Sequence, residues 1–298
     1  MATTLTSVPQ QSKLLNRVKG LYVGLYLTAA MVASVYAFTQ LFAESFQWGW
    51  VGVLLTTLPF MFTLTKAFIF KEMARTPAHM VGNVIWGVAG VVIALLGMLM
   101  FGGTLIPVGV AVLLLLGYVA YDYWYSDLGR QPSPVLNVGE TLPDFTVYRG
   151  NGTPLQSATL RGSPALILFF RGNWCPFCVA QIREIVASYQ ELADRGVKTW
   201  FISPQTEKHT QDLAKQFNVP CEFLSDHNNQ VAEQLGIAAE GGLPVGMEVL
   251  GYDSDTVLPT ALVVDGTGKI IYSDQTTNYR VRPEPQEYLA ILDAQGVS

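Results

Sequence analysis

Four long stretches of apolar residues constrain this chain more than any other feature of its sequence. Each is 18 to 22 residues long, enough for a helix rising about 1.5 Å per residue to cross the roughly 30 Å hydrocarbon core of a bilayer. No charged side chain occurs in them before Asp122, near the end of the last stretch. Four consecutive helices without a polar face are unusual in the core of a soluble protein. The sequence therefore predicts four membrane-spanning helices, at residues 21–42, 48–65, 80–101 and 104–124.

The basic residues that flank these stretches predict how the helices are oriented. Six Lys or Arg residues lie before the first stretch or between the second and third, whereas the other two connections, AESFQ and GG, contain none. Because Lys and Arg are enriched on the cytoplasmic side of membrane proteins, we expect the N-terminus to be cytoplasmic. After four crossings the rest of the chain should also face the cytoplasm, from an inner or plasma membrane. The six residues are Lys13, Arg17, Lys19, Lys66, Lys71 and Arg75.

The predicted membrane domain, residues 1–127, offers few groups for chemistry. It contains no cysteine, and its only histidine is His79, so neither a thiol relay nor a haem held between two histidines is available there. No ionisable side chain lies in the middle of a stretch, where transporters and proton relays place such groups. We therefore expect these helices to anchor or oligomerise the protein in the lipid bilayer. Residues 128–137, which contain two prolines, are predicted to be a short extended linker.

The remaining residues, 138–298, have the composition of a soluble domain. From residue 128 onward the chain carries 12 Lys or Arg and 19 Asp or Glu. This acidic balance lacks the basic patch of a nucleic-acid binder, so no nucleic-acid partner is expected. Short apolar runs alternate with helical patterns, and two apolar strands joined by a Gly-containing turn precede a final helix. Such alternation predicts an α/β fold with a mixed central sheet flanked by helices.

A Cys-x-x-Cys motif follows the buried-strand pattern ALILFF, and the apolar spacing after it predicts one helix over residues 175–196. Cys175 would lie at the N-terminus of this helix, where free N–H groups and the helix dipole favour a thiolate. Pro176 suits the first turn, which needs no N–H partner. Cys178 lies one turn deeper on the same face, within reach of a disulfide. We therefore predict Cys175 as the nucleophile and Cys178 as its redox disulfide partner.

Other interpretations of the cysteines were weighed against redox chemistry. A zinc site needs two more ligands, and Cys221, His209 and His227 lack the paired spacing of such sites, so no metal is expected. Two inert core cysteines are an alternative, but Cys-x-x-Cys after a strand in a cytosolic domain is typical of redox chemistry. Cys221 begins an apolar strand and is either a small buried residue, which we favour, or a second resolving thiol.

Several segments of the second half resemble the peroxiredoxin family, which includes alkyl hydroperoxide reductases and thiol-specific antioxidant proteins. They are VGETLPDFTVYRGNG, LRGSPALILFF and ISPQTEKHTQDLAKQFNVPCEFLSD, and the resemblance covers about residues 137–293. The cysteine motif, RGNWCPFC, is similar to the peroxiredoxin-like branch with R-G-x-W-C-P-F/Y-C. In it, Gly172 stands where the main peroxiredoxin signature has Thr or Ser. The resemblance implies a thioredoxin-like fold and thiol-dependent reduction of peroxides, with no cofactor.

The resemblance also implies roles for residues around the cysteines. Trp174 precedes the first cysteine as in thioredoxins and would shield the sulfur, with packing in the core as the alternative. Pro259, in the sequence LPT, stands where the family has a cis-proline that faces the dithiol. Arg171, Arg280 and Arg282 are candidates to stabilise a thiolate or a peroxide oxygen, and a solvated surface charge is the alternative for each. Arg282 best matches the family's arginine ahead of the last helix.

These features predict a membrane-anchored redoxin. Its expected reaction is reduction of a peroxide by Cys175, with Cys178 resolving the product and a thioredoxin- or glutathione-type thiol as electron donor. Two alternatives remain open: a thioredoxin-type reductase of protein disulfides, and a non-enzymatic membrane scaffold or redox sensor. The glycine-rich segment 238–256 is either a mobile loop beside the site or, as we favour, a plain surface connection.

Overall fold

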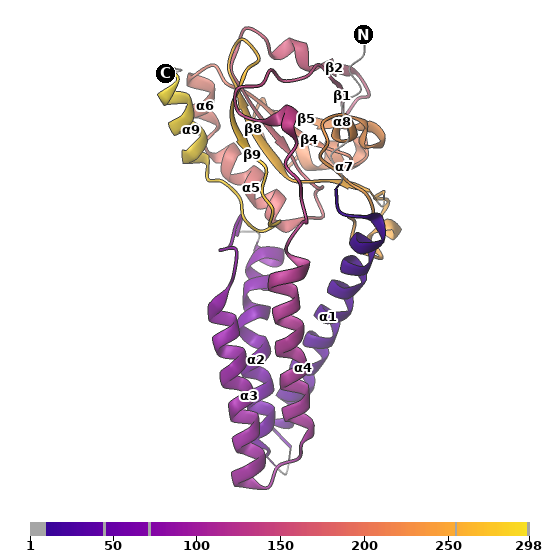
Figure 1. Ribbon diagram of the computed structural model, residues 1–298, viewed down its shortest axis with the longest axis vertical. Helices are drawn as coiled ribbons and strands as arrows, with labels where there is room; N and C mark the ends of the chain where they lie inside the picture. Colours follow the sequence, from indigo (N-terminus) through magenta and orange to yellow (C-terminus); the bar gives the residue numbers. More distant parts are fainter. Residues whose placement is uncertain (1–9, 44–45, 71–72, 254, 297–298) are drawn as a thin grey trace.

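The structure is a computed structural model that describes residues 10–43, 46–70, 73–253 and 255–296. Four long helices stand beneath a layered α/β unit (Figure 1). Lys71, one of the six flanking basic residues, and residues 44–45 of the AESFQ connection lie outside the described residues. The long helices are α1 (Lys13–Gln40), α2 (Trp48–Thr65, continued by the turn η1, Lys66–Phe70), α3 (Val81–Phe101) and α4 (Ile106–Ala120, continued by η2, Tyr121–Tyr125).

These four helices are each long and apolar enough to cross a membrane, as predicted. Large apolar side chains such as Leu25, Val35 and Leu113 are exposed on their outer surface, which suits contact with lipid rather than water. Helix α1 begins earlier than the apolar stretch because the side chain of Ser12 accepts a hydrogen bond from Leu15 N and caps the helix. The first turns of α1 are therefore polar and lie against the α/β unit.

Small residues bring α2 and α3 close together. A Cβ atom on Gly52 would collide with the backbone of Gly90, and a Cβ on Gly90 would collide with Gly52 and Thr56. Apolar side chains gain little by leaving lipid for one another, so close backbone approach and the dispersion contacts it allows stabilise such helix pairs. Gly52 and Gly90 thus serve the packing of α2 against α3.

The α/β unit is built on a seven-stranded mixed sheet with the order β2-β1-β5-β4-β3-β8-β9. The three central strands β5, β4 and β3 run parallel, and each strand outside them is antiparallel to its neighbour. This confirms the predicted thioredoxin-like α/β fold with a mixed sheet. The strands are β1 (Thr146–Arg149), β2 (Pro154–Gln156), β3 (Ala165–Phe169), β4 (Lys198–Ser203), β5 (Glu222–Ser225), β8 (Thr260–Val264) and β9 (Ile270–Asp274).

The central strand β3 is buried on both faces, so its alternate residues enter two separate cores. Leu166 and Leu168 pack in one core with residues of α5 and α9. Ile167 and Phe169 pack in the other with residues of α8 and of the segment before β1. The flanking helices are α5 (Pro176–Ala187), α6 (Tyr189–Asp194), α7 (Glu207–Ala214), α8 (Gln230–Gln234) and α9 (Pro285–Ala294).

One local prediction was wrong. The single helix predicted over residues 175–196 is divided into α5 and α6, because Ser188 leaves the helical region at φ −92° and ψ 12°. The segment 128–137, predicted to be a short extended linker, makes contacts with the α/β unit. Arg130 is buried and donates hydrogen bonds to Pro259 O (2.7 Å) and Thr260 Oγ1 (2.8 Å), so this segment is packed onto the sheet.

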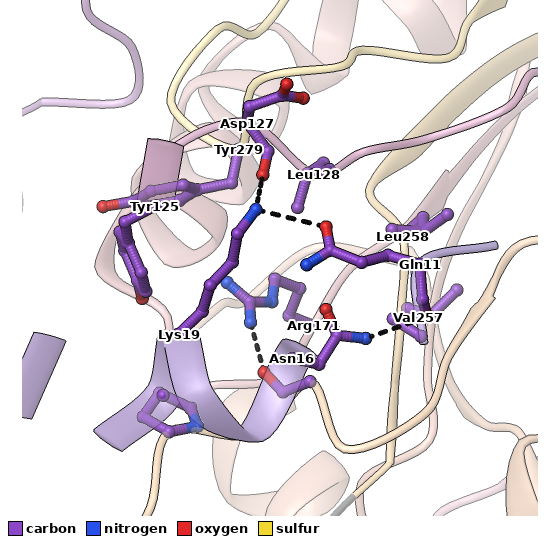
Figure 2. Close-up of a pocket in the computed structure, with 14 residues that line it drawn as sticks. Gln11, Asn16, Lys19, Tyr125, Asp127, Leu128, Arg171, Val257, Leu258 and Tyr279 are labelled. Carbon is purple, nitrogen blue, oxygen red and sulfur yellow. Dashed lines mark hydrogen bonds between the residues drawn. The ribbon is translucent and has the colours of Figure 1, made fainter. Parts of the chain in front are cut away.

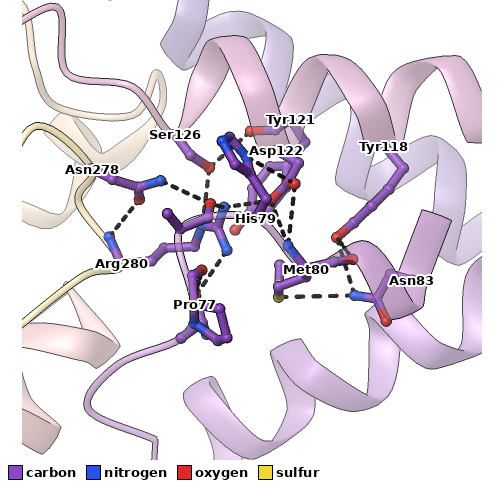
Figure 3. A network of polar contacts seen from close by, with 12 residues as sticks. Pro77, His79, Met80, Asn83, Tyr118, Tyr121, Asp122, Ser126, Asn278 and Arg280 are labelled. Atoms are coloured by element: carbon purple, nitrogen blue, oxygen red, sulfur yellow. Dashed lines mark hydrogen bonds and ion pairs between the residues drawn. The ribbon is translucent and has the colours of Figure 1, made fainter.

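A buried ion pair joins the α/β unit to the helices (Figure 3). Arg280, in the loop before α9, donates to Asp122 Oδ1 on η2 at 2.5 Å, and both side chains are fully buried. The same guanidinium donates to Ser126 Oγ (3.0 Å), Thr76 Oγ1 (2.8 Å) and Ala78 O (3.0 Å). All four hydrogen bonds of the Arg280 guanidinium named here go to the junction between the helices and the α/β unit. Arg280 therefore stabilises this junction, and not a thiolate as predicted.

Candidate active site

The two cysteines of the motif lie at the start of α5, where the chain turns from β3 into the helix. Cys175 is the N-cap residue, Pro176 is the first helical residue, and Cys178 follows in the first turn. The two Sγ atoms are 2.8 Å apart, and both thiols are free. Only 2% of Cys175 and 1% of Cys178 is exposed. The helix thus brings the sulfurs together, as the spacing predicted, but in a site closed to bulk water.

Gly172 allows the motif to fold back on itself. Its φ of +146° disfavours residues with a side chain, and a Cβ there would lie 2.6 Å from Trp174 Nε1. Gln205 Oε1 also accepts a hydrogen bond from Asn173 N at 2.9 Å. This explains in physical terms why glycine, rather than Thr or Ser, precedes Trp174 here.

Two arginines contribute positive charge at the dithiol. Arg282 is 5% exposed, and its Nη2 atom lies 3.9 Å from Cys178 Sγ. The guanidinium of Arg171 lies 4.8 Å from the centre of the Trp174 ring and donates a hydrogen bond to Gly242 O. Figure 2 shows Arg171 beside Lys19 of α1, whose amine donates to Asp127 O at 2.5 Å. The structure therefore places Arg171, Trp174 and Arg282 near the cysteines.

The electrostatic environment gives the two thiols different pKa values. Burial acts to raise the pKa of Cys178, but the hydrogen bond with Cys175 and the positive charges of Arg282 and Arg171 outweigh it and lower that pKa to about 6. Burial and the neighbouring Cys178 raise the pKa of Cys175 well above its ordinary value. The positive charges of Arg282 and Arg171 thus favour a thiolate on Cys178.

This differs from the predicted titration, in which Cys175 has the lower pKa. The N-cap position of Cys175 does not bring the expected stabilisation, because its side chain makes no capping hydrogen bond to the helix N–H groups. The position of Arg282 beside Cys178 could not be seen in the sequence, since more than a hundred residues separate them. Which thiol titrates first was therefore decided by packing and not by the helix terminus.

The charge of Arg282 should set the pH at which the dithiol ionises. In a Cys221→Ser background, thiolate absorbance of the reduced protein should rise with pH around a midpoint near 6, the pKa of Cys178. Arg282→Gln should move that midpoint to higher pH, because a nearby cation favours the thiolate. Arg183→Gln, an exposed arginine on the same helix α5, is the matched control and should leave it unchanged. An unshifted midpoint in Arg282→Gln would contradict the assigned charge pairing.

Two other predicted residues differ from expectation. Pro259 is buried just before β8, but the bond before it is trans, as are all peptide bonds within the described residues. Its carbonyl accepts the hydrogen bond from Arg130 that fixes the segment after the membrane helices. The trans isomer leads directly into the extended strand β8, so the predicted cis-proline is wrong. Cys221 is partly buried and packs against the core beside α5, which agrees with a packing role; burial raises its pKa to about 11.

The segment 238–256 lies against the site rather than forming a plain surface connection. It contains a short hairpin, β6 (Ala238–Ala239) with β7 (Thr256–Val257), and the turn η6 (Met247–Leu250). Tyr252 OH donates to Asn173 Oδ1 within the cysteine motif, and Gly242 O accepts from Arg171. These contacts make the segment part of the wall around the dithiol.

The histidines considered as metal ligands have other contacts. His209 stacks on Tyr252 with ring centres 4.2 Å apart, and His227 stacks on Tyr148 at 3.8 Å. In the part of the chain that the structure describes, no group of three His, Cys, Asp or Glu side chains is placed to hold a metal ion.

An apolar cavity of about 410 Å³ lies between the long apolar helices and the dithiol. Cys175 borders it, whereas Cys178 is not among its lining residues. The sequence did not indicate that the apolar stretches contribute to the site, because nothing in their local pattern marks the residues involved. The lining residues from the helices are Val23, Gly24, Leu27, Leu64, Phe68, Tyr121 and Tyr125, and those from the α/β unit are Arg171, Trp174, Cys175, Pro176, Phe177, Pro244, Met247 and Tyr279.

The sequence of the α/β unit matches a known family. Residues 138–273 match the model of the AhpC/TSA family. These residues form an AhpC/TSA family domain. The match includes both cysteines of the motif, and it confirms the resemblance to peroxiredoxins noted from the sequence.

Named relatives of the AhpC/TSA domain are peroxiredoxins. A chloroplastic peroxiredoxin Q of Sedum lineare is 28% identical over 122 residues, which is 40% of this chain and 65% of that protein. A putative peroxiredoxin bcp of Coxiella burnetii is 28% identical over 105 residues, 35% of this chain and 70% of that protein. The chain spans between about half and two thirds of the length of the plant relatives that it matches.

Solved structures similar to this chain include a protein named peroxidoxin and one named AhpC. Peroxidoxin BcpB of Mycobacterium tuberculosis is 21% identical, with a TM-score of 0.44, and the match covers 53% of this chain and 97% of that chain. AhpC of Enterococcus faecalis is 16% identical, with a TM-score of 0.44, and the match covers 53% and 92%.

Proposed function

We propose that this chain is a membrane-anchored redoxin that reduces peroxides through Cys175, with Cys178 as the resolving thiol. The observation that carries the proposal is the placement of the two sulfurs. Cys175 borders a cavity that a substrate can occupy, and Cys178 lies 2.8 Å behind it next to Arg282. A buried dithiol whose lower pKa is about 6 is suited to thiolate chemistry, which a passive scaffold does not need.

The proposed reaction begins with a proton transfer within the pair. The Cys175 thiol passes its proton to the Cys178 thiolate, and the Cys175 thiolate attacks the outer oxygen of the peroxide. The O–O bond breaks, Cys175 becomes a sulfenic acid, and the alkoxide takes a proton to leave as an alcohol. The Cys178 thiol then attacks the sulfenic sulfur and releases water. The net change converts dithiol and peroxide into disulfide, alcohol and water, and an external thiol donor of thioredoxin or glutathione type restores the dithiol.

Steady-state assays of the detergent-solubilised full-length protein test this proposal against its alternative. Hydrogen peroxide and an organic hydroperoxide should be consumed, whereas insulin disulfide should react slowly because both sulfurs are almost fully buried. The Cys221→Ser variant should behave like the unmodified protein, because Cys221 packs against the core away from the motif. Consumption of insulin disulfide alone would instead identify a reductase of protein disulfides.

We also propose that residues 1–127 form the membrane domain, that residues 128–137 connect it, and that residues 138–298 face the cytoplasm. The asymmetry of the six basic residues supports this orientation. A single cysteine at Asn137, which is exposed, in a background without the three native cysteines should react with a membrane-impermeant thiol reagent only after the cells are permeabilised. Labelling of intact cells would contradict the orientation.

A further inference from the structure

The cavity beside Cys175 is larger and more apolar than a small peroxide requires. Its volume of about 410 Å³ lies in the range of sites for organic ligands, roughly 300–1,000 Å³, whereas one water molecule occupies about 30 Å³. Among the lining residues that the structure describes, Arg171 is the single charged one. The hydroxyls of Tyr121 and Tyr279, which also line it, are 2.6 Å apart and bonded to each other. The cavity therefore suits a substrate with a sizeable apolar part.

The walls of the cavity belong to two different parts of the molecule. Val23, Gly24 and Leu27 come from α1, and Leu64 and Phe68 come from α2 and its continuation η1. These residues lie in the helices that are apolar enough to cross a membrane. Figure 1 shows that α1 runs at an angle to the other helices, with its N-terminal end standing apart from them where it meets the α/β unit.

The lining residues at the outer side of the cavity are open to the surroundings of the helices. Gly24 is exposed, and a Cβ built on it would meet no atom within 4 Å. Phe68 is 50% exposed. Cys175 and Trp174 line the same cavity from the α/β unit. An apolar chain lying along α1 can thus pass from the lipid-facing surface to the attacking sulfur.

We propose that α1 and α2 form part of the substrate site and that the dithiol takes a long-chain organic hydroperoxide directly from the lipid phase. The proposal rests on the peroxidase function proposed above and adds to it a binding site on the membrane helices. The hydroperoxide group lies at Cys175 with Arg171 nearby, and the apolar chain lies against Val23, Leu27 and Phe68. The reaction is the one already described, with the fatty hydroxy compound as the alcohol product.

Gly24 offers a direct test because a side chain can be added there without a collision. In full-length, pre-reduced protein, we would measure single-turnover oxidation by linoleic acid hydroperoxide and by hydrogen peroxide. Gly24→Phe should lower the ratio of the two rates about tenfold, because the added ring occupies space that the apolar chain needs and that hydrogen peroxide does not. Gly109→Phe on α4 is the matched control. Gly109 is also a helical glycine with no atom near its added Cβ and does not line the cavity, so the ratio should stay unchanged.

The possible outcomes separate this proposal from the peroxidase function. If neither peroxide oxidises the dithiol of the unmodified protein, the proposed peroxidase function is wrong. A second outcome is that both peroxides oxidise the unmodified protein while Gly24→Phe leaves the ratio of the two rates unchanged, or changes it no more than Gly109→Phe does. In that case the proposed site on α1 and α2 is wrong, but the peroxidase function stands. Should Gly24→Phe fail to fold, Leu27→Trp fills the same cavity and must lower the ratio in the same direction, with exposed Leu25→Trp on α1 as its control. An unchanged ratio in Leu27→Trp would overturn the proposal.

Discussion

Cys175→Ser is expected to abolish peroxide reduction, with a loss on the order of 10³-fold or more, because it removes the attacking sulfur itself. Cys178→Ser should still complete the first oxidation, since Cys175 remains beside the cavity. Without Cys178 the sulfenic acid has no resolving thiol, so it should accumulate. Mass spectrometry of the protein after one equivalent of peroxide distinguishes the variants: Cys178→Ser should gain one oxygen atom and Cys175→Ser none.

Because Cys178 has the lower pKa of the two thiols, it is the alternative nucleophile, and the same experiment tests it. If Cys175→Ser gains the oxygen and Cys178→Ser does not, then the thiol with the lower pKa, and not the one that borders the cavity, is the nucleophile. A trapped mixed disulfide with another protein in Cys178→Ser would favour the disulfide-reductase alternative. Cys221→Ser serves as the control for loss of a cysteine outside the motif and should form the internal disulfide normally.

Asp122→Asn should strongly destabilise the junction between the helices and the α/β unit. It leaves the fully buried guanidinium of Arg280 without its counter-charge, and removing one partner of a buried ion pair costs about 3–5 kcal/mol. The midpoint of thermal unfolding in detergent should fall by on the order of 10 °C. The site should be affected too, because Arg282 lies two residues from Arg280 and contacts Cys178.

A double-mutant cycle identifies the cause of this loss. Arg280→Met in the Asp122→Asn background removes the unpaired charge, so the double variant should recover part of the stability that the single variant loses. Arg161→Met is the matched control, since Arg161 pairs with Asp144 at an exposed site and its loss should cost less than about 1 kcal/mol. If the buried and exposed pairs proved equally dispensable, the junction would not depend on Arg280.

The junction places the redox site in a fixed relation to the helix bundle. Tyr279, which precedes Arg280 in the chain, forms a hydrogen bond with Tyr121. Arg282, two residues after Arg280, lies beside Cys178. Arg75, in the connection between α2 and α3, donates to Arg282 O at 3.1 Å and pairs with Glu184 of α5. One short loop therefore contacts both the long apolar helices and the dithiol, so these helices form a wall of the site.

The local sequence pattern was sufficient to predict most of the helices and strands of this molecule. The spans follow from uninterrupted apolar stretches, and the strands and helices follow from alternating and helical spacing. The position of Cys175 at the start of a helix follows from the apolar strand before it and from Pro176. Local pattern did not predict the division of the helix at Ser188, which depends on the dihedral angles of one residue.

The amino-acid sequence by itself determined the two-part architecture and the dithiol, because hydrophobic periodicity and residue spacing act over a few turns of chain. Only the tertiary structure decided which arginine serves the sulfurs. The resemblance favoured Arg282 over Arg280, but only the packed structure shows that Arg280 pairs with Asp122 and that Arg282 lies beside Cys178. The tertiary structure also decided that Val23 and Leu27 lie in one cavity with Cys175. Such contacts join residues more than a hundred positions apart, so they arise only when the packed elements bring those residues together.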